Sequence, residues 1–122
     1  MVDFIGSKDC GNSPKNQFVE KIAVGLEAGD LEFLCGVLSE EAVWELTDKS
    51  VVAGDSLRTY IQNHGKGVTL VKIDHVISHG KCGSANGYRQ DKNGKVFHFC
   101  HFIEFTSAKC VKVNRVSSYR KT

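Results

Sequence analysis

Residues 25–46, GLEAGDLEFLCGVLSEEAVWEL, decide the fold, because one helix ends here, a second follows at once and a strand comes next. Gly29 is the residue type that commonly ends a helix, since it adopts a left-handed backbone without strain. Asp30 is a favoured N-cap for the next helix. The apolar positions behind it recur three or four residues apart: Leu31, Leu34, Cys35 and Leu38. Residues 42–46 alternate in polarity, so the stretch predicts a tight helical corner that leads into a strand.

Helices are also predicted on both sides of this corner. Ser13 and Pro14 form a good N-cap and first-turn pair. The apolar residues that follow recur every four positions, with neighbours on the same face: Phe18, Val19, Ile22, Ala23 and Leu26. This pattern predicts an amphipathic helix of roughly four turns that ends near Gly29. Residues 54–63 predict a third, short helix, with Leu57 and Ile61 on one face.

After the third helix the polarity period changes to two, which predicts strands. The predicted strands cover residues 69–79, 82–90, 96–105 and 110–119. Asn93 and Gly94 favour a tight hairpin turn, because both residue types tolerate the positive φ angles that such turns require. Gly83 and Gly87 lie within a predicted strand and indicate a bend, a bulge or the close approach of another backbone.

The order of the elements defines the fold class. Helices come first and a meander of long strands follows, which is typical of an α+β protein with helices packed on one face of an antiparallel sheet. The 122 residues are enough for one ordinary domain and no more. Residues 1–12 are interpreted as an N-terminal extension and residues 13–122 as the single domain.

Composition argues against several classes of protein. A hydrophobic fraction of 41% and a charged fraction of 25% are those of a globular chain, which argues against disorder. A formal charge of +2 is too small for a surface built to bind nucleic acid. No apolar run is long enough to cross a membrane, and the first residues lack a signal-peptide pattern. Five cysteines without a CxxC pair favour a reducing compartment, so we expect a cytoplasmic location.

These features resemble the nuclear transport factor 2-like superfamily, which includes ketosteroid isomerase-like and SnoaL-like proteins. The resemblance covers residues 14–119 and rests on the corner at 25–46, the helix at 54–63 and the closing hairpin KVFHFCHFIEF–VKVNRVSSY. It implies a cone in which the curved sheet wraps around the helices and leaves an internal pocket. It also implies a homodimer through the outer face of the sheet. Such folds host isomerases, dehydratases, cyclases, epoxide hydrolases and non-catalytic binding modules.

Two histidines interrupt apolar strand faces and are the candidate catalytic residues. His75 is predicted to share an inward face with Val71, Ile73 and Ile77, and His101 lies in a row of phenylalanines. Imidazole titrates near neutral pH, so one ring could remove a proton while the other protonates an oxygen. A histidine pair inside the cone is similar to the arrangement in scytalone dehydratase-type enzymes. The alternative for each ring is a hydrogen-bonded core residue.

The other candidates for the pocket are Trp44, Tyr60, Tyr88, Phe99 and Asn114. Trp44 would supply an apolar wall with an N–H donor, and Tyr60 could hang over the mouth of the cavity. The neighbouring glycines leave open whether the Tyr88 side chain lies on the inner or the outer face of the sheet. The facing of Asn114 stays open because the flanking valines are three apart, which indicates a bulge. The aspartates at positions 48, 55 and 74 do not match the usual catalytic base of ketosteroid isomerase-like members.

No metal or cofactor is expected. His98 and Cys100 lie two apart on one strand face with Glu104 further along, but zinc requires three or four converging ligands. The sequence holds no glycine-rich phosphate loop. The basic residues near the C-terminal end, which include Arg115 and Arg120, are expected to be solvated.

Two functions remain open. The first is a cofactor-independent dehydratase, isomerase or cyclase that acts on a small, apolar carbonyl compound through His75 and His101. The alternative is a non-catalytic ligand-binding or dimerisation module. For dimerisation, Val96, Cys100 and Phe102 would form a half-apolar patch on the outer sheet face.

Overall fold

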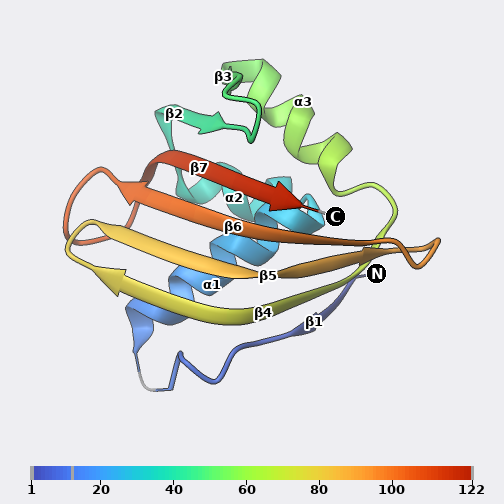
Figure 1. Cartoon of the computed structure of the whole chain (residues 1–122). Helices are drawn as coiled ribbons and strands as arrows, with labels where there is room; N and C mark the ends of the chain where they lie inside the picture. The colour runs from blue at the N-terminus through green and yellow to red at the C-terminus, as the bar shows by residue number, and fades with distance from the viewer. Residues whose placement is uncertain (1, 12, 122) are drawn as a thin grey trace.

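The computed structural model of the chain describes residues 2–11 and 13–121 and confirms the α+β fold. Its elements in chain order are β1 (Asp3–Ile5), α1 (Pro14–Ala28), α2 (Leu31–Val37), β2 (Leu38–Glu45), β3 (Val51–Ala53), α3 (Gly54–His64), β4 (Val68–His79), β5 (Cys82–Asp91), β6 (Val96–Phe105) and β7 (Val113–Lys121). The strands form one sheet in the order β1-β4-β5-β6-β7-β2-β3 (Figure 1). Among the described residues, no helix is long and apolar enough to span a membrane.

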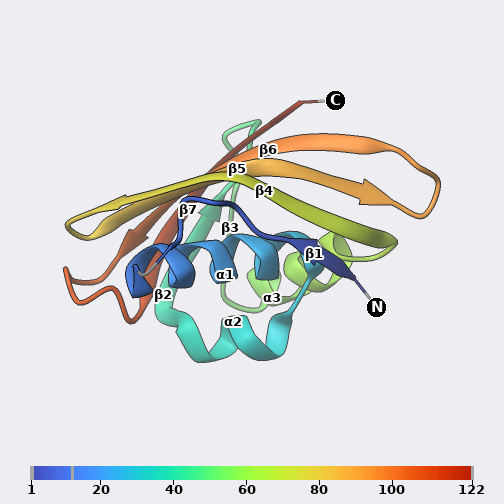
Figure 2. The same ribbon diagram turned by 90° about the horizontal axis from the view of Figure 1, so that it is seen from below.

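The sheet is mixed and strongly curved. The long strands β4 to β7 pair antiparallel in sequence, whereas β1 pairs parallel with β4 and β2 pairs parallel with β7. The three helices lie on one side of the sheet, which is called the inner face below (Figure 2). Helix α1 packs against β4 and β5 and lies beside α2 and α3. The open end of this layer, near α3 and β7, is where the polar site is built.

Helix α1 begins and ends as predicted. The Ser13 hydroxyl caps it by accepting a hydrogen bond from the Asn16 N–H, and Gly29 ends it with φ of 72°. Its buried face includes the expected Val19 and also Glu27, which lies in the last turn. The strand β5 carries glycine where α1 lies closest, because a Cβ at Gly83 would come 2.5 Å from Val19 Cγ2.

The ends of α1 and α3 touch through two glycines. A Cβ at Gly65, just after α3, would overlap the backbone carbonyl of Ala28 and the Cα of Gly29. Gly29 also needs glycine for its left-handed backbone. This contact brings the last turn of α1 against the last residue of α3, so Glu27 comes to lie beside His64.

A bulge in β4 reverses the predicted facing of His75. The pairing of β4 with β5 shifts between Ile73 and His75, which inserts Asp74 as an extra residue. Val76 therefore turns inward, while His75 lies on the opposite side with 74% of its side chain exposed. The prediction that His75 shares an inward face with Ile73 and Ile77 is wrong, because it assumed an unbroken period of two.

Residues of the N-terminal segment lie along the edge of β4. Strand β1 pairs with it at Asp3–Leu70. Further along, one oxygen of Asp9 accepts hydrogen bonds from the Val76 N–H at 3.0 Å and from the His75 ring at 3.3 Å. The aspartate thereby pairs a backbone N–H of β4 beyond the residues that β1 covers.

The inner face of β6 follows the predicted alternation. Phe99, His101, Ile103 and Phe105 are all buried. The bulge expected near the start of β7 is present, because Glu104 pairs with Arg115 but Phe105 pairs with Val113. Asn114 is the extra residue there, and it is exposed.

Candidate functional site

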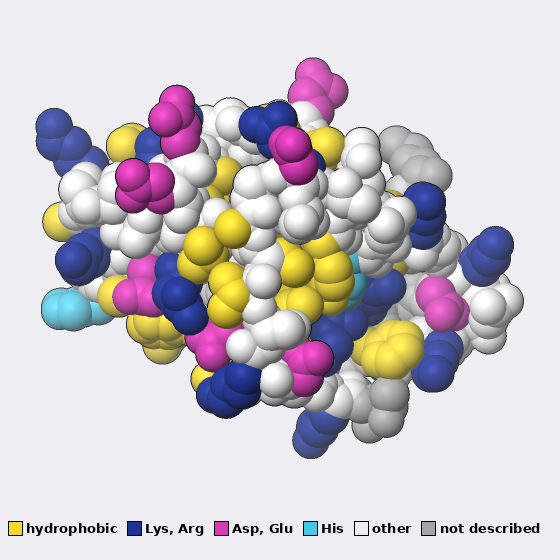
Figure 3. All heavy atoms as spheres, turned by 90° about the horizontal axis from the view of Figure 1, so that it is seen from above, with side chains coloured by type: hydrophobic (Ala, Val, Ile, Leu, Met, Phe, Trp, Pro, Cys, Tyr) yellow, Lys and Arg dark blue, Asp and Glu magenta, His cyan; other side chains and the backbone are white. Residues whose placement is uncertain are grey.

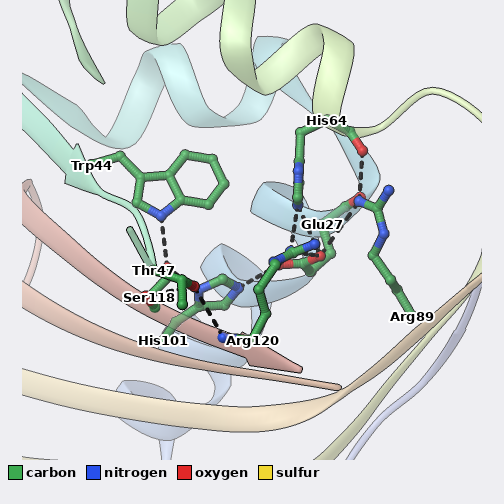
Figure 4. A network of polar contacts seen from close by, with 8 residues as sticks. All are labelled: Glu27, Trp44, Thr47, His64, Arg89, His101, Ser118 and Arg120. Atoms are coloured by element: carbon green, nitrogen blue, oxygen red, sulfur yellow. Dashed lines mark hydrogen bonds and ion pairs between the residues drawn. The ribbon is translucent and has the colours of Figure 1, made fainter. Parts of the chain in front are cut away.

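The site is built around Glu27, an acid with no exposed side-chain surface in the last turn of α1 (Figure 4). One carboxylate oxygen lies 2.7 Å from His101 Nε2 on β6. The other lies 2.8 Å from Arg120 Nη2 on β7 and 3.0 Å from His64 Nε2 on α3. Arg89, on β5, approaches the same oxygen at 3.5 Å. Four donors from four elements thus converge on a single carboxylate.

This environment keeps Glu27 ionised. Burial by itself would raise the pKa of Glu27. Hydrogen bonds from His101 and His64 outweigh burial and hold the pKa of this carboxyl well below its ordinary value. The carboxylate is therefore a permanent acceptor, and the donors around it are fixed in place.

A hydrogen-bonded chain runs from Trp44 to Glu27. The Trp44 indole N–H can only donate, and it does so to Ser118 Oγ at 2.6 Å. The Ser118 hydroxyl lies 2.6 Å from His101 Nδ1 and can donate its hydrogen there. His101 then carries its own hydrogen on Nε2 and donates it to Glu27. This assignment, inferred from the contacts, gives every donor from Trp44 to His101 an acceptor.

Aromatic rings surround this series of hydrogen bonds. Phe99 stacks on His101 with ring centres 4.8 Å apart. Trp44 meets Tyr60 edge-on at 5.1 Å, and Tyr60 stacks on His64 at 5.5 Å. Burial lowers the pKa of His64 and raises the pKa of Tyr60. Both rings are therefore neutral near pH 7.

A hollow of about 220 Å³ borders the network. It is lined by Trp44, Leu46, Thr47, Asp48, Tyr60, Ser118 and Arg120. Ser118 and Arg120 are the network members that reach it, whereas His101 is fully buried with both ring nitrogens engaged. On the face seen from the side of α3 and β3, hydrophobic side chains gather in the middle with a histidine and basic side chains beside them (Figure 3). The hollow therefore combines aromatic walls with a cation and a hydroxyl.

The structure brings some of the predicted site residues together and separates others. Trp44 and Tyr60 line the hollow, and Phe99 and His101 lie directly behind it. Tyr88 lies on the outer face, where its ring meets that of His98 at 6.0 Å. It cannot reach the hollow because its neighbour Arg89 takes the inward position in the alternation of β5. His75 and Asn114 are also away from the hollow, because a bulge displaces each of them.

Sequence reasoning missed Glu27, His64, Arg89, Ser118 and Arg120. Glu27 had a signal, since it continues the buried spacing of Val19 and Ala23 by four residues. Arg120 was expected to be solvated, which is wrong for its guanidinium, because the pairing of Arg120 with Phe99 sets it on the inner face.

No group of three His, Cys, Asp or Glu side chains within residues 2–11 and 13–121 is arranged to hold a metal ion. The side chains that line the hollow include aromatic rings, a guanidinium and a hydroxyl. Such a site can hold a small molecule through apolar contact and a few directed hydrogen bonds.

The fold is that of nuclear transport factor 2-like proteins. An NTF2-like protein of unknown function from Cytophaga hutchinsonii ATCC 33406 superposes with a TM-score of 0.69 at 18% identity, over 88% of this chain and 99% of that one. SalBIII, an epoxide hydrolase/cyclase-like enzyme with a role in pyran ring formation in salinomycin, gives 0.70 at 16%, over 88% and 91%. A candidate ketosteroid isomerase from Kribbella flavida DSM 17836 gives 0.73 at 14%, over 88% and 78%. No protein-family model and no curated protein matches the sequence.

Proposed function

We propose that this protein binds a small, largely apolar molecule in the hollow beside Ser118 and Arg120. The observation that carries the proposal is a hollow with aromatic walls that opens onto a buried network ending at an ionised carboxylate. Two proteins of the same fold are named as an epoxide hydrolase/cyclase-like enzyme and a candidate ketosteroid isomerase, which supports a small-molecule ligand.

Each side chain at the hollow has a role in this proposal. Trp44 and Tyr60 contact the apolar body of the ligand, because their rings face the hollow and contact each other. Arg120 and the Ser118 hydroxyl contact its polar group, such as a carbonyl oxygen. Tight packing on the rings supplies affinity, and the two polar groups set orientation.

Any acid–base step on the ligand would act through Ser118. Dehydratases, isomerases and cyclases need a group that exchanges a proton with a bound carbonyl compound. His101 cannot touch such a compound, because both of its ring nitrogens are occupied inside the protein. It is a positioning residue that holds the Ser118 hydroxyl, and His75 is too far around the sheet to share the site. Ligand binding is therefore the function that the geometry supports best.

Binding can be followed at one indole. Trp44 is the only tryptophan of the chain, so its fluorescence and its single indole N–H resonance report on the hollow. Cyclohexanone, cyclohexanecarboxamide and cyclohexanecarboxylate are suitable probes. We expect at least one of them to shift the indole resonance in a saturable way, and Tyr60→Leu to weaken that probe at least fivefold. Tyr119→Leu, which changes an exposed tyrosine on β7, should not weaken it. No saturable shift with any probe would overturn the proposal.

The outer sheet face supports dimerisation as a second function. Ile77 is 69% exposed and Phe102 is 42% exposed, and both line a mainly apolar hollow of about 270 Å³ on that face. Large exposed apolar side chains of this kind mark contact surfaces. A homodimer through this face should become monomeric in Phe102→Glu when light scattering measures its mass. A wild-type monomer at millimolar concentration would contradict the proposal.

The compartment is also a proposal. All five cysteines are free, and two of them, Cys10 and Cys110, are buried. Free thiols are typical of a reducing environment, so we infer a cytoplasmic location.

A further inference from the structure

The network around Glu27 holds more positive than negative charge. Arg89 and Arg120 each carry a full positive charge, and Glu27 supplies one negative charge. Without the two imidazoles the balance is +1, and protonation of either ring would increase it. An unmatched charge in a protein interior is costly unless another ion offsets it.

The donors of this network also outnumber its acceptors. Nε of Arg89 is buried and has no hydrogen-bond partner among the described residues. Both hydrogen bonds from the Arg120 side chain to Glu27 run through Nη2, and the same nitrogen lies 2.7 Å from His64 Nε2. Nη1 and Nε of Arg120 are therefore each available to donate a hydrogen bond to an outside acceptor, such as one oxygen of a carboxylate.

Arg120 is the cation of the network that faces the hollow. Its side chain is 25% exposed and lines the hollow, whereas Arg89 is committed to the backbone carbonyl of His64 at 2.6 Å. Asp48 is the acid among the lining residues, but one of its oxygens accepts hydrogen bonds from the backbone N–H and the hydroxyl of Ser50. The hollow thus offers a guanidinium with two nitrogens that make no hydrogen bond to the described residues, beside an acid whose hydrogen bonds come from Ser50.

We propose that the ligand of the hollow is a small monocarboxylic acid with an apolar ring or chain, whose carboxylate is bound by Arg120. The inference rests on the proposed binding function and specifies its ligand class. The carboxylate accepts a hydrogen bond from a guanidinium nitrogen that makes none with the described residues. The ring or chain of the acid lies against Trp44 and Tyr60.

Matched pairs of probes test the charge without changing the shape. Cyclohexanecarboxylate and benzoate are each compared with the neutral amide of the same skeleton, and the Trp44 indole N–H resonance gives the dissociation constants at pH 7. We expect each carboxylate to bind at least tenfold more tightly than its amide. Equal binding of acid and amide would overturn the carboxylate inference while the binding function stands. Failure of all four probes would overturn both.

Variants locate the selectivity at Arg120. Arg120→Gln should reduce the ratio of amide to acid dissociation constants to about one, and Arg120→Lys should restore part of it, because Lys keeps the positive charge but not the planar guanidinium. Arg115→Gln is the matched control, since Arg115 lies on the same strand and pairs with Glu45 instead. Thermal unfolding of each variant shows that it is folded at the assay temperature. A ratio unchanged in Arg120→Gln, or lost equally in Arg115→Gln, would overturn the assignment.

Discussion

Glu27→Gln is expected to be among the most destabilising conservative substitutions in this protein. The carboxylate accepts from His101 at 2.7 Å, from Arg120 at 2.8 Å and from His64 at 3.0 Å. A glutamine has one oxygen and one NH2 group, so at least one of these contacts becomes a contact between two donors. The two arginines also lose the negative charge that partly matches them.

The size of the effect follows from the burial of the ion pairs between Glu27 and the two arginines, Arg89 and Arg120. Removing one partner of a buried ion pair costs about 3–5 kcal/mol. For a domain of this length, 1 kcal/mol shifts the melting temperature by roughly 4 °C, so Tm should fall by about 12–20 °C. Urea and thermal unfolding at pH 7, followed by circular dichroism, measure both quantities. Glu45→Gln is the control, because Glu45 is partly exposed beside Arg115 and should behave like the wild type.

The pH dependence gives the same prediction a second readout. Because the pKa of Glu27 is lowered in the folded protein, its contribution to stability is present above its ordinary pKa and is lost as the pH falls through the folded value. The difference in stability between wild type and Glu27→Gln should therefore shrink below about pH 4. A variant within 1 kcal/mol of wild type at pH 7, or a difference that does not change with pH, would refute the reasoning.

Three further predictions concern a helix contact, a titrating ring and the two candidate histidines. Gly65→Ala should lower the free energy of unfolding by about 1–3 kcal/mol, because its Cβ would meet backbone atoms. Gly36→Ala, which has open space around it in α2, should raise the free energy of unfolding by up to about 1 kcal/mol. Equal effects of the two variants in urea unfolding would contradict the packing of α1 on α3. Burial lowers the pKa of His64, so the unfolded chain takes up its proton first and stability should decline as the pH falls below about 6.5. His64→Asn should remove that part of the decline, and parallel curves for both proteins would reject it. His75→Gln should leave stability and ligand binding unchanged. His101→Gln should lower the free energy of unfolding by at least about 2 kcal/mol, because it leaves buried groups unpaired. A larger loss of stability in His75→Gln than in His101→Gln would show that the two rings are misplaced.

The sequence predicts correctly the buried faces of those helices and strands in which the spacing of hydrophobic residues is regular. The stripe of α1 is continuous from Val19 to Leu26, and the phenylalanine face of β6 alternates without interruption, so both were assigned to the correct side. Local signals also fixed the ends of α1, because Ser13 and Gly29 act through their own backbone and side chains.

The facing of His75 could not be predicted in this way. A single extra residue, Asp74, exchanges the two faces of the strand from that point on. The contact at the bulge comes from Asp9, which lies far away in the sequence and is not part of any local pattern.

The site itself depends on contacts between distant segments. Glu27 and Arg120 are separated by most of the chain, and each looks like an ordinary surface residue by type. Their meeting depends on the pairing of β6 with β7 and on the glycine contact between the ends of α1 and α3. A charged residue at a buried helical position was the one signal available, and it pointed to Glu27 alone.

Occupation of the hollow beside Arg120 is tested most directly by a crystal structure of the protein grown with cyclohexanecarboxylate. We predict density for the acid in the hollow, with its carboxylate at hydrogen-bond distance from Arg120 and its ring against Trp44 and Tyr60. Density for the acid only on the outer sheet face, or an unchanged hollow at a concentration that saturates the indole shift, would contradict the binding site.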